Sequence, residues 1–191
     1  MVKTKDNSGI MKGLSKTVHP NCFLRQSPLT KACDTIKKLS NKAKSLIKKE
    51  IDFCHELNLI AGNSITYVSG STSVYTSAEN SISLGKGVCQ DFAHILISMA
   101  RYNNFPARYV NGFLFEDANS NENTTHAWVE IFINDIGWIG FDPSHKKCID
   151  ERYVRVSCGY DFLDASTIKG VKTNYSGNEN LLVKVQISQA Q

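Results

Sequence analysis

The spacing of apolar residues changes once along this chain, and that change constrains the fold more than any other feature. From Leu29 to about Leu59 they recur every three or four positions, which predicts one or two amphipathic helices with a break at Ser40–Asn41. From Ala107 onward they alternate, which predicts strands over residues 107–115, 127–133, 137–141, 153–157 and 181–187. Helices followed by a run of strands indicate an α+β domain with an antiparallel sheet.

A reactive thiol lies between these two regions. A short helix is expected over residues 77–84, and the run Gly85-Lys-Gly-Val-Cys-Gln-Asp-Phe-Ala-His94 then predicts a glycine-rich turn that leads into a second helix, which ends before Pro106. Cys89 falls in the first turn of that helix. Unpaired N–H groups and the positive end of the helix dipole favour a thiolate there. Cys89 is therefore a candidate nucleophile.

A cysteine nucleophile needs a histidine to take its proton and a carboxylate to orient that histidine. Residues 127–141 predict a β-hairpin that turns at Asn134–Asp135. If the hairpin folds about Asn134, His126 stands opposite Asp142, with their Cβ atoms about 4.5–5.5 Å apart. His126 and Asp142 thus become the candidate partners of Cys89.

The same register places Trp128 opposite Gly140, where the missing side chain would leave room for the indole. Shifting the register by one residue would move Asp142 to the wrong face of the sheet. The polar stretch Glu116–Thr125 ends directly at His126 and is either a simple hairpin loop or also one wall of the entrance to the site.

The length of 191 residues suits one domain with a sizeable core. Residues 1–22 are polar and aperiodic, which predicts a flexible tail before a catalytic domain over residues 23–191. No apolar run approaches the ~18 residues that predict a membrane span, and the basic start at Met1–Asp6 is not followed by an apolar stretch typical of a signal peptide. We therefore expect a cytoplasmic protein, with export without a cleavable signal as the alternative.

The basic residues are concentrated in the first 50 positions, which hold eleven lysines, while the whole chain has a net charge of +4. Binding to nucleic acid or to an anionic surface is one interpretation. The solvated face of a helix plus a polar tail is the interpretation that we favour, because no aromatic residues are interleaved with the lysines. We expect neither a nucleic acid nor a membrane as a partner.

The six cysteines show no CxxC pair, so the sequence supports neither a zinc site nor a redox dithiol. Cys33 and Cys54 are expected to be buried as small hydrophobic residues. Cys148 and Cys158 could bind a metal together with His145, but we disfavour that alternative. The prediction is an enzyme without a metal or an organic cofactor.

Four motifs in a fixed order resemble the bacterial transglutaminase-like superfamily, a branch of the papain-like thiol enzymes. They are Gly87-Val-Cys-Gln-Asp-Phe-Ala-His94, Pro106-Ala-Arg-Tyr-Val-Asn-Gly112, His126-Ala-Trp-Val-Glu130 and Gly137-Trp-Ile-Gly-Phe-Asp-Pro143. The resemblance runs from about Phe23 to Ile187. It implies a papain-like core in which the cysteine helix packs on an antiparallel sheet, with Cys89 as nucleophile, His126 as general base and then acid, and Asp142 as the orienting carboxylate.

The chain also departs from the pattern of that family. Relatives often begin with a β-rich domain, and near the C-terminus they tend to read Gly-Arg-Asp-Tyr followed by a proline. Here that segment is Gly159-Tyr-Asp-Phe162, and Thr167 stands where the proline would be. This puts in doubt any substrate contact inferred from the segment. Tyr67 lies where relatives carry an aromatic residue beside the site, and we expect it to pack rather than to bind an oxyanion.

The resemblance implies acyl transfer through a thioester on a protein or peptide amide. We expect hydrolysis, as in a cysteine protease or amidase. The alternatives are transfer to an amine, as in a transglutaminase, and a catalytically idle binding module that keeps the fold. The sequence makes no prediction about the oligomeric state.

Overall fold

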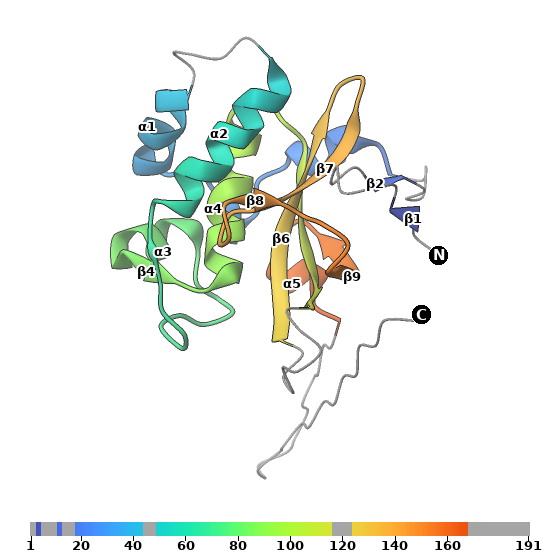
Figure 1. Ribbon diagram of the computed structural model, residues 1–191. Helices are drawn as coiled ribbons and strands as arrows, with labels where there is room; N and C mark the ends of the chain where they lie inside the picture. Colours follow the sequence, from blue (N-terminus) through green and yellow to red (C-terminus); the bar gives the residue numbers. More distant parts are fainter. Residues whose placement is uncertain (1–2, 5–10, 13–17, 44–48, 116–123, 168–191) are drawn as a thin grey trace, which may run out of the picture.

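A computed structural model of the protein describes residues 3–4, 11–12, 18–43, 49–115 and 124–167. Four helices gather on one side, and a twisted antiparallel sheet stands beside them (Figure 1). The predicted α+β architecture, with the cysteine helix packed on the sheet, is confirmed.

The helical part is built mainly from amphipathic segments, as the apolar spacing predicts. Its members are α1 (Asp34–Ala43), α2 (Glu50–Gly62), α3 (Ala78–Leu84) and α4 (Cys89–Tyr102), with a last short helix α5 (Phe162–Ala165) and two 3₁₀ turns, η1 (Pro20–Leu24) and η2 (Pro28–Thr30). Among the described residues, no helix has both the length and the hydropathy needed to cross a bilayer.

The predicted helix break at Ser40–Asn41 is wrong, because α1 continues to Ala43. Ser40 is fully buried, and its hydroxyl receives a hydrogen bond from the Asn103 side chain at the end of α4. This tertiary contact satisfies a hydroxyl that would otherwise compete with the helix backbone.

The main sheet has the strand order β8-β7-β6-β5-β9, with every neighbouring pair antiparallel. Its strands are β5 (Ala107–Leu114), β6 (Thr124–Ile133), β7 (Gly137–Asp142), β8 (Lys147–Cys148) and β9 (Tyr153–Gly159). Four of them match predicted strands, and β8 is new. The strand predicted over residues 181–187 lies outside the described residues.

Two small ladders accompany this sheet. β1 (Lys3–Thr4) pairs antiparallel with β2 (Met11–Lys12), and β3 (Thr66–Tyr67) pairs parallel with β4 (Lys86–Gly87). The N-terminal tail predicted over residues 1–22 falls largely outside the described residues, so it stays a prediction.

The two faces of the main sheet bury different clusters. Ala127, Val129, Ile131 and Ile133 of β6 share the large core with the helices, as the alternation in the sequence predicts. On the opposite face, a smaller cluster is made of Val110, Leu114, Trp128, Ile149 and Tyr153. The chain passes from β8 across the sheet to β9 (Figure 1), and two members of the cluster, Ile149 and Tyr153, lie on this crossing or at its end. This crossing brings Tyr153 toward the end of the hairpin.

Candidate active site

The turn before Cys89 is held by backbone hydrogen bonds to β3. Gly85 ends α3 with a φ of 66°, in the left-handed region that glycine adopts without strain. Its carbonyl accepts the Thr66 N–H at 2.9 Å, and the Gly87 carbonyl accepts the Val68 N–H at 2.9 Å. The glycine-rich turn predicted from the sequence thus fixes where α4 begins, at Cys89.

An aspartate caps the first turn of α4. The Asp91 carboxylate accepts the Val88 N–H at 2.8 Å and the Thr72 hydroxyl at 2.6 Å, both through Oδ2. The neighbouring loop is also bound to α4, because the Gln90 side chain donates to the Ser73 carbonyl at 3.2 Å. The N–H of Cys89 is among the first four of the helix, which have no partner within it.

The structure brings Cys89, His126 and Asp142 together from α4, β6 and β7. His126 Nε2 lies 2.7 Å from Asp142 Oδ2. The Cys89 thiol acts on the same imidazole and contributes to its raised pKa. Because Nε2 is bound to Asp142, Nδ1 is the ring nitrogen that remains for the cysteine. Asp142 is fully buried, His126 is nearly so, and Cys89 is half-buried.

The predicted hairpin register is wrong by two residues. Val129 pairs with Phe141 and Glu130 with Gly140, so Asp142 lies two positions further along β6 than expected and is a diagonal neighbour of His126. Side chains repeat every two residues along a strand, so a shift of two keeps both groups on one face. The His126–Asp142 contact survives the error for this reason.

The expected role of Gly140 is also wrong. It is Gly112, paired with His126 on β5, that leaves room for the Trp128 indole, since a Cβ there would lie 2.6 Å from the Trp128 ring. Gly140 instead leaves room for Ile149, which a Cβ would approach to 2.4 Å.

Electrostatics favour a protonated His126. Burial by itself would lower the pKa of this imidazole, but the hydrogen bonds to Asp142 and Cys89 and the attraction of their negative charges raise it to about 9. Burial likewise opposes the charge on Asp142, yet hydrogen bonds from His126, His145 and Ser144 hold the pKa of its carboxyl far below the usual range. The site therefore stabilises an imidazolium between two groups that can carry negative charge.

Asp142 has more partners than the sequence suggests. Its Oδ2 also receives His145 Nδ1 at 2.7 Å and the Tyr153 hydroxyl at 2.7 Å. Its Oδ1 accepts the Ser144 hydroxyl at 2.6 Å, the Ser144 N–H at 3.0 Å and the His145 N–H at 3.2 Å. The spacing of three residues after Asp142 could have drawn attention to His145, whereas no local signal marks Tyr153.

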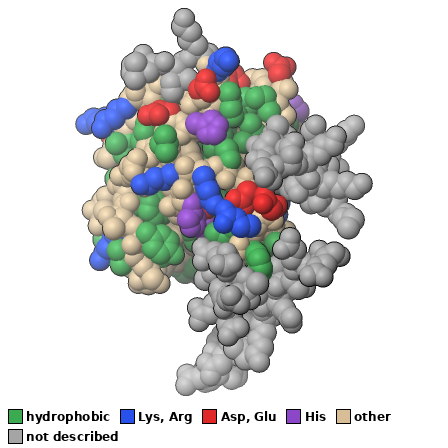
Figure 2. Space-filling model, viewed as in Figure 1, with side chains coloured by type: hydrophobic (Ala, Val, Ile, Leu, Met, Phe, Trp, Pro, Cys, Tyr) green, Lys and Arg blue, Asp and Glu red, His purple; other side chains and the backbone are tan. Residues whose placement is uncertain are grey.

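His126, Asp142 and His145 offer ligand atoms within 4.8 Å of one another, a spacing that could also suit a metal ion. These atoms are already joined by hydrogen bonds of 2.7 Å, and the remaining Asp142 oxygen accepts further donors. We therefore interpret the cluster as a hydrogen-bonded network. Histidine, basic and acidic side chains lie side by side across the middle of this face (Figure 2).

Burial decides the chemistry of two of the other cysteines. Cys54 is fully buried, as predicted, and burial raises the pKa of its thiol to about 12. Burial also raises the pKa of Cys148 to about 11. Cys33 is half-buried rather than buried, because it precedes α1 instead of lying within it.

Tyr67 stacks on Phe92 of α4, with ring centroids 6.3 Å apart, while more than half of its surface stays exposed. This is the packing position that the sequence predicts. The loop expected as a possible wall of the site lies largely outside the described residues.

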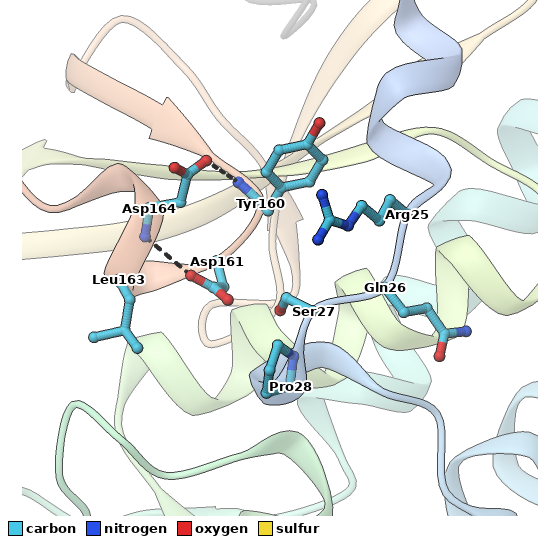
Figure 3. Close-up of a pocket in the computed structure, with 8 residues that line it drawn as sticks. All are labelled: Arg25, Gln26, Ser27, Pro28, Tyr160, Asp161, Leu163 and Asp164. Atoms are coloured by element: carbon cyan, nitrogen blue, oxygen red, sulfur yellow. Dashed lines mark hydrogen bonds between the residues drawn. The ribbon is translucent and has the colours of Figure 1, made fainter.

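An open cleft of about 440 Å³ lies between the segment Arg25–Pro28 and the corner that joins β9 to α5 (Figure 3). Arg25 lies over the Tyr160 ring, and Asp161 accepts the Asp164 N–H at 3.0 Å. None of the three residues Cys89, His126 and Asp142 belongs to its lining. The convergence of reactive groups, and not this cleft, therefore defines the candidate site.

The segment that departs from the family pattern, Gly159–Phe162, contributes Tyr160 and Asp161 to that cleft and docks on α4. The Phe162 N–H donates to His94 Nε2 at 3.2 Å, and the Tyr160 carbonyl accepts from Arg101 at 2.8 Å. Burial lowers the pKa of His94 to about 4, so this histidine is neutral and accepts the hydrogen bond.

Comparisons with known proteins agree with the fold. A family model described as the transglutaminase-like superfamily matches residues 37–143, more than half of the chain. The chain therefore belongs to the transglutaminase-like superfamily. It is 33% identical over 132 residues to the uncharacterized protein Rv2569c of Mycobacterium tuberculosis strain H37Rv, and the match covers 64% of this chain and 41% of that protein.

Solved structures show the same fold. A candidate cysteine protease from Cytophaga hutchinsonii is 32% identical with a TM-score of 0.65, and the match covers 76% of this chain and 48% of that one. The periplasmic domain of TgpA from Pseudomonas aeruginosa has a TM-score of 0.51 at 18% identity, over 68% of this chain and 49% of that domain. The chain thus spans less than half the length of these relatives.

Proposed function

We propose that this protein hydrolyses amide bonds of peptides or glutamine side chains through a thioester on Cys89, with His126 and Asp142 as its catalytic partners. The observation that carries the proposal is the 2.7 Å contact of His126 with Asp142, together with the effect of the Cys89 thiol on the pKa of the same imidazole. A thiol, an imidazole and a carboxylate in this order are what nucleophilic acyl transfer requires.

In the first half of the proposed reaction, the Cys89 sulfur attacks the carbonyl carbon. The carbon–nitrogen bond then breaks, and the His126 imidazolium gives its proton to the leaving nitrogen. The Cys89 N–H, at the start of α4, would donate to the oxyanion. In the second half, water gives a proton to His126, attacks the thioester and releases the acid and the thiolate.

Hydrolysis is our choice over amine transfer for two reasons. The Cytophaga hutchinsonii relative, at 32% identity, is described as a candidate cysteine protease. Cys89 is also only half-buried, whereas a transferase must keep water away from the thioester.

Selective alkylation tests the nucleophile. The protein is treated with limiting iodoacetamide between pH 5 and 9, and each cysteine peptide is quantified by mass spectrometry. Cys89 should react first and should retain its reactivity at the acidic end, and His126→Ala should slow it at least tenfold. Cys22, which is exposed, serves as the internal control. If Cys89 reacts no faster than Cys22 across the range, the proposal is wrong.

A glutamine-bearing peptide then separates the two reactions. Ammonia release without an added amine indicates hydrolysis, and incorporation of a fluorescent primary amine indicates transfer. We expect ammonia release that the amine does not change. Cys89→Ser is the negative control for both measurements, and a rate that depends wholly on the amine would identify a transferase instead.

A further inference from the structure

Asp142 Oδ2 is the meeting point of three donors, and only one of them belongs to the proposed triad. His126 Nε2, His145 Nδ1 and the Tyr153 hydroxyl each lie 2.7 Å from this oxygen. A carboxylate oxygen has two lone pairs, so the three donors must share them. Orienting His126 requires only one of these bonds.

Tyr153 approaches from the far edge of the sheet. It is buried, begins β9, and packs its ring against the edge of Trp128 with centroids 5.4 Å apart. Its ring also lies 5.9 Å from that of His126. With the ring packed in this way, the hydroxyl lies 2.7 Å from Asp142 Oδ2. Burial and the charge of Asp142 raise the pKa of Tyr153 well above its usual value, which keeps the hydroxyl a donor.

His145 approaches from the turn after β7. Its backbone N–H binds Asp142 Oδ1 at 3.2 Å while its ring binds Oδ2, so one residue contacts both oxygens. The turn closes at Lys146, which has a φ of 58°. The imidazole of His145 is partly exposed, and its centroid lies 5.2 Å from that of His126.

We propose that Tyr153 and His145 are positioning residues that hold the Asp142 carboxylate ionised and aimed at His126 Nε2. A carboxylate with no exposed surface is costly to keep charged unless donors replace water. Ser144 and the His145 N–H already hold Oδ1, so the oxygen whose position remains to be fixed is Oδ2, which faces His126. The two extra donors fix Oδ2 and offset its negative charge, and the imidazolium that faces Cys89 is stabilised as a result. This inference rests on the proposed function of Cys89 and His126.

The test uses three variants in the full chain. Tyr153→Phe removes only the hydroxyl, and His145→Ala removes the second donor. His145→Asn places an amide N–H near the position of Nδ1 and should restore the contact. Tyr160→Phe and His55→Asn are matched controls, since their rings pack on Phe23 and Phe141 and are not bonded to Asp142.

For each variant we would measure the rate of Cys89 alkylation at pH 7, and kcat and KM for the amide substrate. We expect Tyr153→Phe to slow alkylation and to lower kcat about tenfold, because it removes one hydrogen bond to a charged group. The KM should stay within twofold of the wild-type value. His145→Ala should lower the alkylation rate and kcat about threefold to tenfold, and His145→Asn should restore most of this loss. The controls should change less than twofold.

A proton NMR spectrum separates positioning from a purely structural effect. The low-field resonance of the His126 ring N–H bonded to Asp142 should shift or broaden in Tyr153→Phe while the thermal midpoint stays within a few degrees. An unchanged resonance together with unchanged alkylation would overturn the inference. If Tyr153→Phe does not fold, the inference is tested by the His145 variants: equal alkylation rates and kcat values for His145→Ala and His145→Asn would overturn it.

The two proposals fail in different ways. If wild-type Cys89 reacts no faster than Cys22, the proposed function is wrong, and the resonance still tests whether Tyr153 positions Asp142. If wild-type Cys89 is selectively reactive and the variants match it, only the positioning roles are wrong.

Discussion

Gly87 and Asp91 share one small space at the start of α4. A Cβ built on Gly87 would lie 2.8 Å from Asp91 Oδ2, the oxygen that accepts the Val88 N–H. The glycine before the nucleophile is therefore required because the capping aspartate folds back over it. This relationship explains why Gly87, Cys89 and Asp91 occur together in one motif.

The Gly87→Ala substitution should damage the nucleophile helix. The added methyl group would displace the Asp91 carboxylate and with it the cap, so we expect a loss of about 1–3 kcal/mol in the free energy of unfolding and slower alkylation of Cys89. Urea denaturation and the alkylation assay measure the two effects. Lys86→Ala, at the exposed neighbouring position, is the control. Unchanged alkylation would show that the cap does not position Cys89.

Gly62→Ala should act on Asp142 from the other side of the site. A Cβ at Gly62, the last residue of α2, would lie 2.4 Å from the carbonyl oxygen of Pro143. The turn that carries Asp142 must then move, so we expect about 1–3 kcal/mol lower stability and a lower kcat. Asn63→Ala, at the exposed next residue, should leave kcat within twofold. Equal kcat values for both variants would contradict this account.

Turnover should depend on the proton of His126. The pKa of this group is raised to about 9, so the imidazolium is present below that pH and is lost above it. The leaving nitrogen needs this proton, and we therefore expect kcat to fall as the pH rises through about 9, approaching tenfold per pH unit. Alkylation of Cys89 needs no proton and should not fall in the same range. A decline centred near 6.5, the usual value for histidine, would refute the raised pKa.

The stability of the fold should also respond to His126. A raised pKa in the folded state contributes stability that is complete below the unfolded value near 6.5 and is lost as the pH rises through about 9. The free energy of unfolding should thus decrease over this window in the wild type by up to about 3 kcal/mol. The decrease should be smaller in His126→Ala. Identical pH profiles of denaturation for the two proteins would rule out this linkage.

Two ion pairs should differ sharply in their effect on stability. Glu130 is fully buried and is paired with Arg108, whose guanidinium lies 3.9 Å above the Trp138 ring. Glu130→Ala should cost about 3–5 kcal/mol, because it leaves a buried cation without its partner. Asp150→Ala removes a partly exposed partner of Arg152 and should cost less than about 1 kcal/mol. Chemical denaturation compares the two, and equal losses would contradict the burial argument.

The local part of this structure could be predicted from the sequence. The boundaries of α3 and α4 follow from apolar spacing and from Gly85, whose left-handed backbone ends a helix. The faces of β6 follow from alternation alone. The break at Ser40 could not be predicted, since the contact that keeps the helix intact comes from Asn103, about sixty residues later in the chain.

In the candidate site, too, some features could be predicted from the sequence and others could not. Cys89, His126 and Asp142 could be selected from the sequence, because a helix start, a strand face and a two-residue period are local properties. The register of the hairpin could not, since the turn runs over the three residues between Ile133 and Gly137 and is centred on Asp135, which has a φ of 64°, and not on Asn134.

The sequence by itself determined the order of helices and strands, the face on which each side chain lies, and the three groups that carry the proposed chemistry. Only the tertiary structure decided which further donors surround Asp142. Tyr153 reaches that carboxylate because the chain crosses the sheet between β8 and β9, and no pattern within either strand encodes the crossing. Local periodicity depends on backbone geometry, whereas a contact across the sheet depends on how all the strands pack together.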